Sequence, residues 1–239
     1  SGESLDPEVQ ATLRHEELIT HLVGMLADED ARNRRTATVT LGWLRETRAT
    51  APLLELLADA SVREFASHAL VSIGFVDRPA WLRGLAHADD AVRLGTLRCL
   101  AWIAPPDGTA LVAPLIHDPS AEVRAEAAAA VGRLGDEDAA MLLFELLGDE
   151  SELIQESAMA SLARMSPARV LPLLVQAFLD PADHVVARGA HQARHLAQQL
   201  IGLGDVVQRP LARHGLDGEY RLASVRPGVE VDVTREPVG

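Results

Sequence analysis

Two histidines near residue 193 have the spacing of metal ligands. His191 and His195 stand at positions i and i+4, which places both imidazoles on one face of a helix. A zinc site needs at least one further protein ligand, and only Asp183 or His184 lies in the preceding turn. No glutamate accompanies the pair as a general base. We therefore expect no metal and no other cofactor.

Catalysis by a nucleophile also lacks a sequence signature. Cys99 is the single cysteine, and it falls in a column of small residues that predicts a buried structural thiol. The chain contains neither a glycine-rich phosphate loop nor the nucleophile turn of serine hydrolases. These observations favour a non-enzymatic protein.

Tryptophan and arginine side chains offer binding chemistry instead. Trp43 and Trp102 occupy equivalent positions of a repeating pattern, two copies apart. Exposed tryptophan beside arginine is typical of interface anchors, and Arg98 stands one helical turn before Trp102, where it could stack on the indole. The alternative is that each tryptophan fills a gap between neighbouring repeats. The predicted partner-binding residues are Trp43, His68, Arg98, Trp102, Arg133, Arg164 and His195.

These residues are positioned by an internal repeat with a period of 29 to 31 residues, the spacing from Arg34 to Arg63 and from Arg93 to Arg124. Each copy has an apolar first half, a turn that usually contains Asp, and a second half with the periodicity of an amphipathic helix. At about 100° per residue, the positions five and nine after the Arg column point away from the core. The Arg column reads Arg34, Arg63, Arg93, Arg124, Gln155 and Val186.

A helical pair of this kind leaves one apolar stripe uncovered, so neighbouring pairs must stack. We predict an all-α solenoid, an α-α superhelix of about six two-helix repeats. The Asp and Arg columns are predicted to form a structural ladder, in which each Arg meets an Asp of its own or the next repeat. Gln155 and Val186 interrupt this ladder, so looser or bent repeats are expected toward the carboxyl terminus.

The segment 116–135 carries a family resemblance. Its Asp118-Pro119, Val123-Arg124 and Val131-Gly132 pairs stand in a pattern that resembles the HEAT repeat, in the bacterial variety named after phycobilisome lyases. The resemblance covers about residues 15–199. It implies a protein-binding scaffold with second helices along the concave face, or alternatively a lyase-like or chaperone-like subunit that handles a bilin or another acidic small molecule.

The carboxyl-terminal segment departs from the repeat. We assign residues 1–199 to the solenoid with an N-terminal capping helix, and residues 200–239 to a cap. Alternating Val229, Val231 and Val233 predict one strand of a short β-hairpin with residues 219–225, and a flexible tail is the alternative.

Charge and hydropathy set the remaining expectations. The 239 residues include 35 acidic and 22 basic side chains, none of them Lys, and the net charge of −13 disfavours a phosphate backbone as partner. No stretch has the length and apolarity of a membrane span. The sequence thus predicts a cytoplasmic, bacterial adaptor that binds a protein or peptide with an acidic patch, and neither nucleic acid nor membrane.

Overall fold

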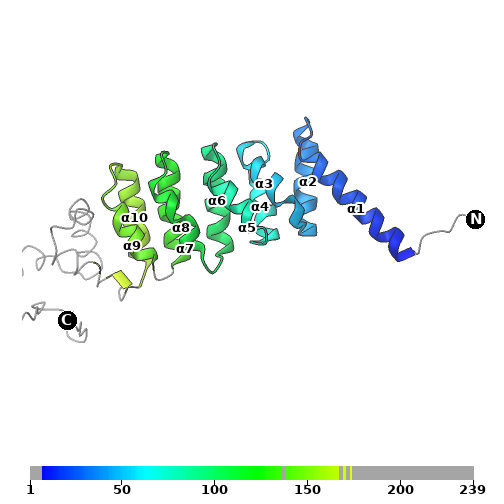
Figure 1. Cartoon of the computed structure of the whole chain (residues 1–239). Coiled ribbons are helices and arrows are strands. Elements are labelled where there is room, and N and C mark those ends of the chain that lie inside the picture. The colour runs from blue at the N-terminus through cyan, green and yellow to red at the C-terminus, as the bar shows by residue number, and fades with distance from the viewer. Residues whose placement is uncertain (1–6, 136–137, 167–168, 171–172, 174–239) are drawn as a thin grey trace, which may run out of the picture.

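The structure, a computed structural model, describes residues 7–135, 138–166, 169, 170 and 173. Its helices stand side by side in a row that follows the chain from α1 to α10 (Figure 1). The α-helices are α1 (Pro7–Met25), α2 (Ala31–Leu44), α3 (Thr50–Glu55), α4 (Arg63–Ile73), α5 (Arg78–Leu85), α6 (Asp90–Ile103), α7 (Gly108–Val112), α8 (Ala121–Leu134), α9 (Ala139–Leu146) and α10 (Glu152–Arg164). Three 3₁₀ segments join them: η1 (Thr47–Ala49), η2 (Leu56–Ala58) and η3 (Ala113–His117).

The elements form five antiparallel pairs within the described part of the chain. The second member of each pair is one of α2, α4, α6, α8 and α10, and these helices pack against each other in sequence order as one layer. The first members are α1, the η1–α3–η2 segment, α5, the α7–η3 segment and α9. The prediction of an all-α solenoid is confirmed. The sixth repeat, the cap and the hairpin fall outside the described residues.

The repeat columns of the sequence form the core between the two layers. Small residues three positions after the Arg column allow close helix approach, and aliphatic residues seven positions after it fill the space between pairs. In the five described pairs, the members of both columns are fully buried. They are Ala37, Ala66, Thr96, Ala127 and Ala158, with Leu41, Leu70, Leu100, Val131 and Leu162.

Two glycines show how tightly the second helices stack. A Cβ added to Gly42 of α2 would lie 2.8 Å from the Cα of Ala69 in α4, and one added to Gly132 of α8 would lie 2.4 Å from the Cβ of Ser161 in α10. Such short distances leave no space for a side chain at either position. Close helix contact thus replaces bulky aromatic packing in a chain with only 3% aromatic residues.

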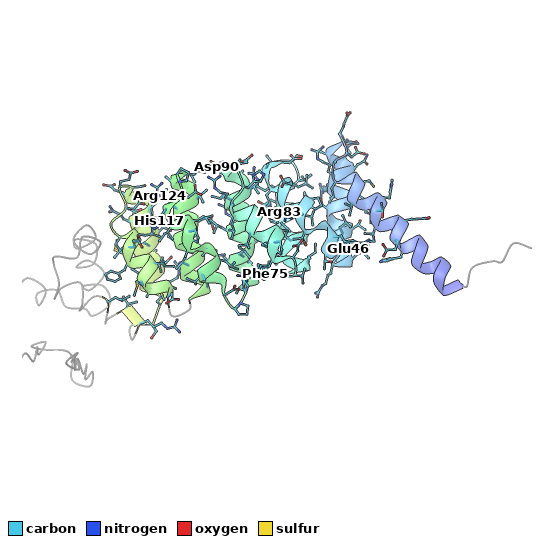
Figure 2. The ribbon with its side chains drawn as sticks, viewed as in Figure 1. Glu46, Phe75, Arg83, Asp90, His117 and Arg124 are labelled. Carbon is cyan, nitrogen blue, oxygen red and sulfur yellow. The ribbon has the colours of Figure 1, made fainter. Side chains whose placement is uncertain are left out.

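The two ends of the second helices form the two long edges of the solenoid. Asp90 and Arg124 lie on one edge, beside the amino ends of α6 and α8, and Phe75 lies on the opposite edge, after the carboxyl end of α4 (Figure 2). Among the helices described, none combines the length and the apolarity needed to cross a membrane.

Candidate functional site

A strip of exposed side chains runs along the layer of second helices, from the middle of these helices to their carboxyl ends. All six of the described residues predicted for partner binding are exposed, and we call this set the outer strip. The indole of Trp43 has 82% of its surface exposed and that of Trp102 has 71%. His195 lies outside the described residues. The outer strip comprises Trp43 of α2, His68 of α4, Arg98 and Trp102 of α6, Arg133 of α8 and Arg164 of α10.

Helix geometry explains this exposure. Because the core columns occupy one side of each second helix, the positions five and nine after the Arg column project on the opposite side. Ser72 of α4, also exposed, occupies the strip position between the two indoles. The remaining tryptophan, Trp81 of α5, is fully buried and packs against Phe75 with a centroid separation of 6.0 Å. Trp81 thus belongs to the core, whereas most of the surface of Trp43 and Trp102 faces solvent.

The arginines of the outer strip divide into two kinds. Arg98 Nε donates to Glu126 Oε2 of the next repeat at 2.8 Å, so its charge is already paired. The guanidinium over Trp102 is therefore that of Arg133, at 5.4 Å from the ring centroid, and the expected stacking of Arg98 on Trp102 is replaced by this contact. A charge-assisted hydrogen bond to a carboxylate is more stabilising than an exposed cation–π contact, which explains why Arg98 pairs with Glu126 and does not stack on Trp102.

A cavity of about 310 Å³ opens where the basic end of the strip meets the end of α10. Arg164 belongs both to the strip and to the cavity wall, and its Nη2 donates to Ser161 Oγ at 3.1 Å. Sequence reasoning identified Arg164 but not the cavity, because the wall combines residues from two neighbouring repeats. Its lining residues are Gly132, Gly135, Arg164, Met165, Ser166 and Arg169.

The Arg column forms the predicted ladder at the other edge of the solenoid. Each rung has two parts: the guanidinium donates to main-chain oxygens of its own repeat, and it pairs with an Asp of the next one. Arg93 donates to Asp118 Oδ2 at 2.7 Å and Oδ1 at 2.9 Å, and to the carbonyl of His87 at 2.8 Å. Arg34 pairs with Asp59 and Arg124 with Asp149 in the same way. The predicted structural role of these arginines is confirmed.

Gln155 and Arg63 depart from this arrangement in different ways. Gln155 keeps the bond within its own repeat, since its Nε2 donates to the carbonyl of Asp149 at 2.7 Å. Arg63 likewise donates to Leu57 O at 2.6 Å, but the turn of the next repeat has His87 at the position where Asp118 and Asp149 stand in the following repeats. Val186 lies outside the described residues.

Cys99 of α6 is buried, as its column of small residues predicted. Burial raises the pKa of the Cys99 thiol to about 12, and its Sγ lies 3.9 Å from the carbonyl oxygen of Ser67, so it is not a thiolate at neutral pH. The described residues contain no group of three or more His, Cys, Asp or Glu placed to hold a metal ion. The pair His191 and His195 lies outside them.

Comparison with known families agrees with the repeats seen in the fold. A family model described as HEAT repeats matches residues 8–74, 78–143 and 109–193, which together span most of the chain. The chain belongs to the HEAT-repeat family. The matched residues include the five described helix pairs of this HEAT-repeat protein, with the Asp–Arg ladder and the outer strip.

Individual relatives are more distant. The HEAT-repeat chain is 28% identical over 144 residues to the bilin biosynthesis protein MpeU of Synechococcus sp. (strain WH8020). The match covers 56% of this chain and 48% of the relative, so the chain spans about half the length of that curated protein.

Solved structures with similarity to this HEAT-repeat chain are also remote. The crystal structure of one engineered protein has a TM-score of 0.40 and 17% identity, and the match covers 74% of this chain and 97% of that one. A second engineered protein has a TM-score of 0.39 and 20% identity, and the match covers 75% of this chain and 58% of that one. The complex of CpcE and CpcF of phycocyanin lyase from Nostoc sp. PCC7120 has a TM-score of 0.27 and 18% identity, covering 84% of this chain and 96% of that one.

Proposed function

We propose that this HEAT-repeat protein is a non-catalytic scaffold that binds a protein or peptide partner along the outer strip. The observation that carries the proposal is the exposure of Trp43 and Trp102 on a chain whose third tryptophan is entirely buried. Covering an indole removes about 150–250 Å² from water, which contributes roughly 4–6 kcal/mol before ordering costs. Two such residues, which stand two repeats apart on the same layer of helices, supply the anchors that interfaces commonly use.

The charge of the strip favours an acidic partner surface. The chain carries a net charge of −13, yet the strip contributes Arg98, Arg133 and Arg164, and Glu126 is the one carboxylate among the described residues that pairs with any of them. A locally basic strip on an acidic protein attracts negatively charged segments. We therefore assign the partner an acidic patch.

Site-directed photo-cross-linking tests this proposal. A photoreactive amino acid replaces Trp102 in one variant and Met141 in a control, and both full chains are irradiated in extract from the native host. Met141 is a matched control because it is 65% exposed but belongs to α9, in the other layer. A partner cross-linked from position 102 and not from 141 supports the proposal. Affinity capture from the same extract, without a photoreactive group, then compares wild type with Trp43→Ala/Trp102→Ala. Loss of this partner in the double variant supports the proposal, and equal capture by the two proteins would contradict it.

A second candidate is a lyase-like or chaperone-like subunit that handles a bilin. It rests on the 28% identity to a protein named for bilin biosynthesis. A bilin carries carboxylates that arginines such as Arg164 bind well. The test is the visible absorption spectrum of a free bilin before and after addition of the protein: a shift that disappears in Arg164→Glu favours this candidate, and an unchanged spectrum removes it.

A further inference from the structure

The outer strip changes chemical character along its length. Toward the amino terminus, large apolar side chains are exposed at the carboxyl ends of three consecutive second helices. Five of the nine exposed large hydrophobic residues of the described chain lie there, and we call these five residues the apolar end. These residues are Trp43 and Leu44 of α2, Val71 of α4, Val76 just after it, and Trp102 of α6.

The same helix position carries positive charge in the following repeats. The position nine residues after the Arg column is occupied by Trp43, Ser72 and Trp102 in the first three repeats, and by Arg133 and Arg164 in the next two. Arg133 marks the boundary, since its guanidinium lies over the Trp102 ring. Arg98 adds little net charge because Glu126 pairs with it, so among the arginines of the outer strip the positive charge available to a partner lies on α8 and α10.

The basic end also contains a place for a carboxylate. The cavity of about 310 Å³ next to Arg164 is also lined by Ser166 and Met165, with no acidic residue among the described lining residues. Arg169, at the same wall, already donates through Nη1 to the carbonyl oxygen of Gly135, so Arg164 is the cation that we assign to a carboxylate. Arginine in a fixed position binds carboxylates with both charge and directed N–H groups.

From this polarity we infer that the partner binds as an extended segment with a defined direction. Its apolar side chains cover the α2–α6 end, and aspartate or glutamate side chains reach Arg133 and the cavity at Arg164. The inference rests on the proposed function, since it specifies the chemistry and the orientation of the segment that the outer strip binds. A uniformly acidic segment would leave both indoles in water, and a uniformly apolar one would desolvate Arg133 without a partner.

Synthetic peptides test this inference with the full chain. One fluorescently labelled probe has an aromatic and aliphatic half followed by a glutamate half, and a second probe has glutamine in place of every glutamate. Fluorescence anisotropy gives the affinity of each. We expect the glutamate probe to bind at least tenfold more tightly, and Arg164→Glu to remove about this factor for that probe only. Arg83→Glu, an exposed arginine of α5 in the other layer, is the matched control and leaves both affinities unchanged.

Each outcome separates the inference from the proposed function. Equal affinity of the two probes, including no binding by either, overturns the carboxylate site. Suppose that both probes bind wild type with equal affinity and that neither binds Trp43→Ala/Trp102→Ala. This result would support the scaffold function and contradict the inferred direction of the bound segment. A glutamate preference that survives in this double variant supports the carboxylate site and contradicts the use of the indoles. Circular dichroism of every variant verifies that its helices are intact.

Discussion

Two neighbouring junctions of the solenoid differ in the rung that joins them. Between α6 and α8, Arg93 binds Asp118 through two hydrogen bonds, and the side chains are only 11% and 6% exposed. Between α4 and α6, Arg63 donates to the carbonyls of Leu57 and Ala58, and among the described residues no carboxylate pairs with it. The same column thus contains a complete ion-paired rung and a rung made of carbonyl bonds alone.

His87 explains how the second junction keeps its local shape. Asp118 Oδ1 accepts the N–H of Ser120 at 2.9 Å, and in the equivalent turn of the preceding repeat His87 Nδ1 accepts the N–H of Asp89 at 3.0 Å. His87 Nε2 lies 3.1 Å from Glu55 Oε2. The imidazole therefore reproduces the turn bond of the missing aspartate but not its pairing with arginine. The Asp column has two separable roles, and the histidine serves only one.

Breaking the complete rung should have the largest effect. In Arg93→Ala, the nearly buried Asp118 carboxylate loses its cation and the carbonyls of His87 and Ala88 lose their donor. We expect the free energy of unfolding in urea to fall by about 2–4 kcal/mol. Arg63→Ala should cost about 1 kcal/mol, since it removes carbonyl bonds only. Equal losses in the two variants would mean that the Asp118 pairing adds no stability.

Acid titration of the complete rung should have the next largest effect. Burial alone would raise the pKa of Asp118, but the hydrogen bonds from Arg93 and the Ser120 N–H, with the charges of Arg93 and Arg124, outweigh it and hold this pKa below its ordinary value. A lowered pKa in the folded state stabilises the fold above the unfolded-state pKa, about 4 for aspartate, and this contribution is lost as the pH falls through the folded-state value.

The variant Asp118→Asn isolates this contribution. At pH 7 it should be less stable than wild type by about 1–3 kcal/mol, because Arg93 loses a charged acceptor. The gap should narrow as the pH falls below about 4, where wild type loses the same charge. Thermal unfolding followed by circular dichroism at several pH values measures it. Glu17→Gln, an exposed position of α1, is the control; a gap for Asp118→Asn that stays constant at low pH would refute the assignment.

Completing the second rung should give a smaller gain. His87→Asp offers Arg63 a carboxylate while retaining an acceptor for the Asp89 N–H, at the loss of the contact with Glu55. We expect an increase in unfolding free energy of about 0.5–1 kcal/mol, moderated by the neighbouring Asp89 and Asp90 charges. In the Arg63→Ala background the gain should disappear. A gain that persists there would show that the substitution acts through the turn and not through the rung.

Much of this architecture could be predicted from the sequence because each repeat places residues of the same type at the same positions. Leu41, Leu100 and Leu162 fall in one column and all reach the core. The angle of Trp43 and Trp102 relative to that column predicted their exposure, since the helix fixes directions within one element. The ladder was predictable for the same reason, although the sequence left open which Asp each Arg binds.

Contacts between repeats were less predictable, because they depend on the offset between helices rather than on the angles within one. The pattern within α6 suggested Arg98 as the cation over Trp102, but Arg133 of α8 occupies that place. The cavity at Arg164 has walls from α8 and from the end of α10, and no single-helix pattern reveals it. The sequence shows His87 in place of Asp in the Asp column. That this change removes the ion pair of Arg63 but keeps the turn bond became clear only from comparison with the complete rungs.

The smallest effect on stability should come from the opposite ends of the same helices. The ladder joins the amino ends of the second helices, whereas Trp43 and Trp102 project into solvent near the carboxyl ends. Trp43→Ala should change the free energy of unfolding by less than about 0.5 kcal/mol. Trp102→Ala should cost no more than about 0.5–1 kcal/mol, the value of its exposed contact with Arg133. Urea unfolding decides between the two interpretations of these residues. A loss above about 2 kcal/mol would identify the indoles as packing between repeats, and a near-zero loss leaves binding as the reason why such large apolar surfaces face water.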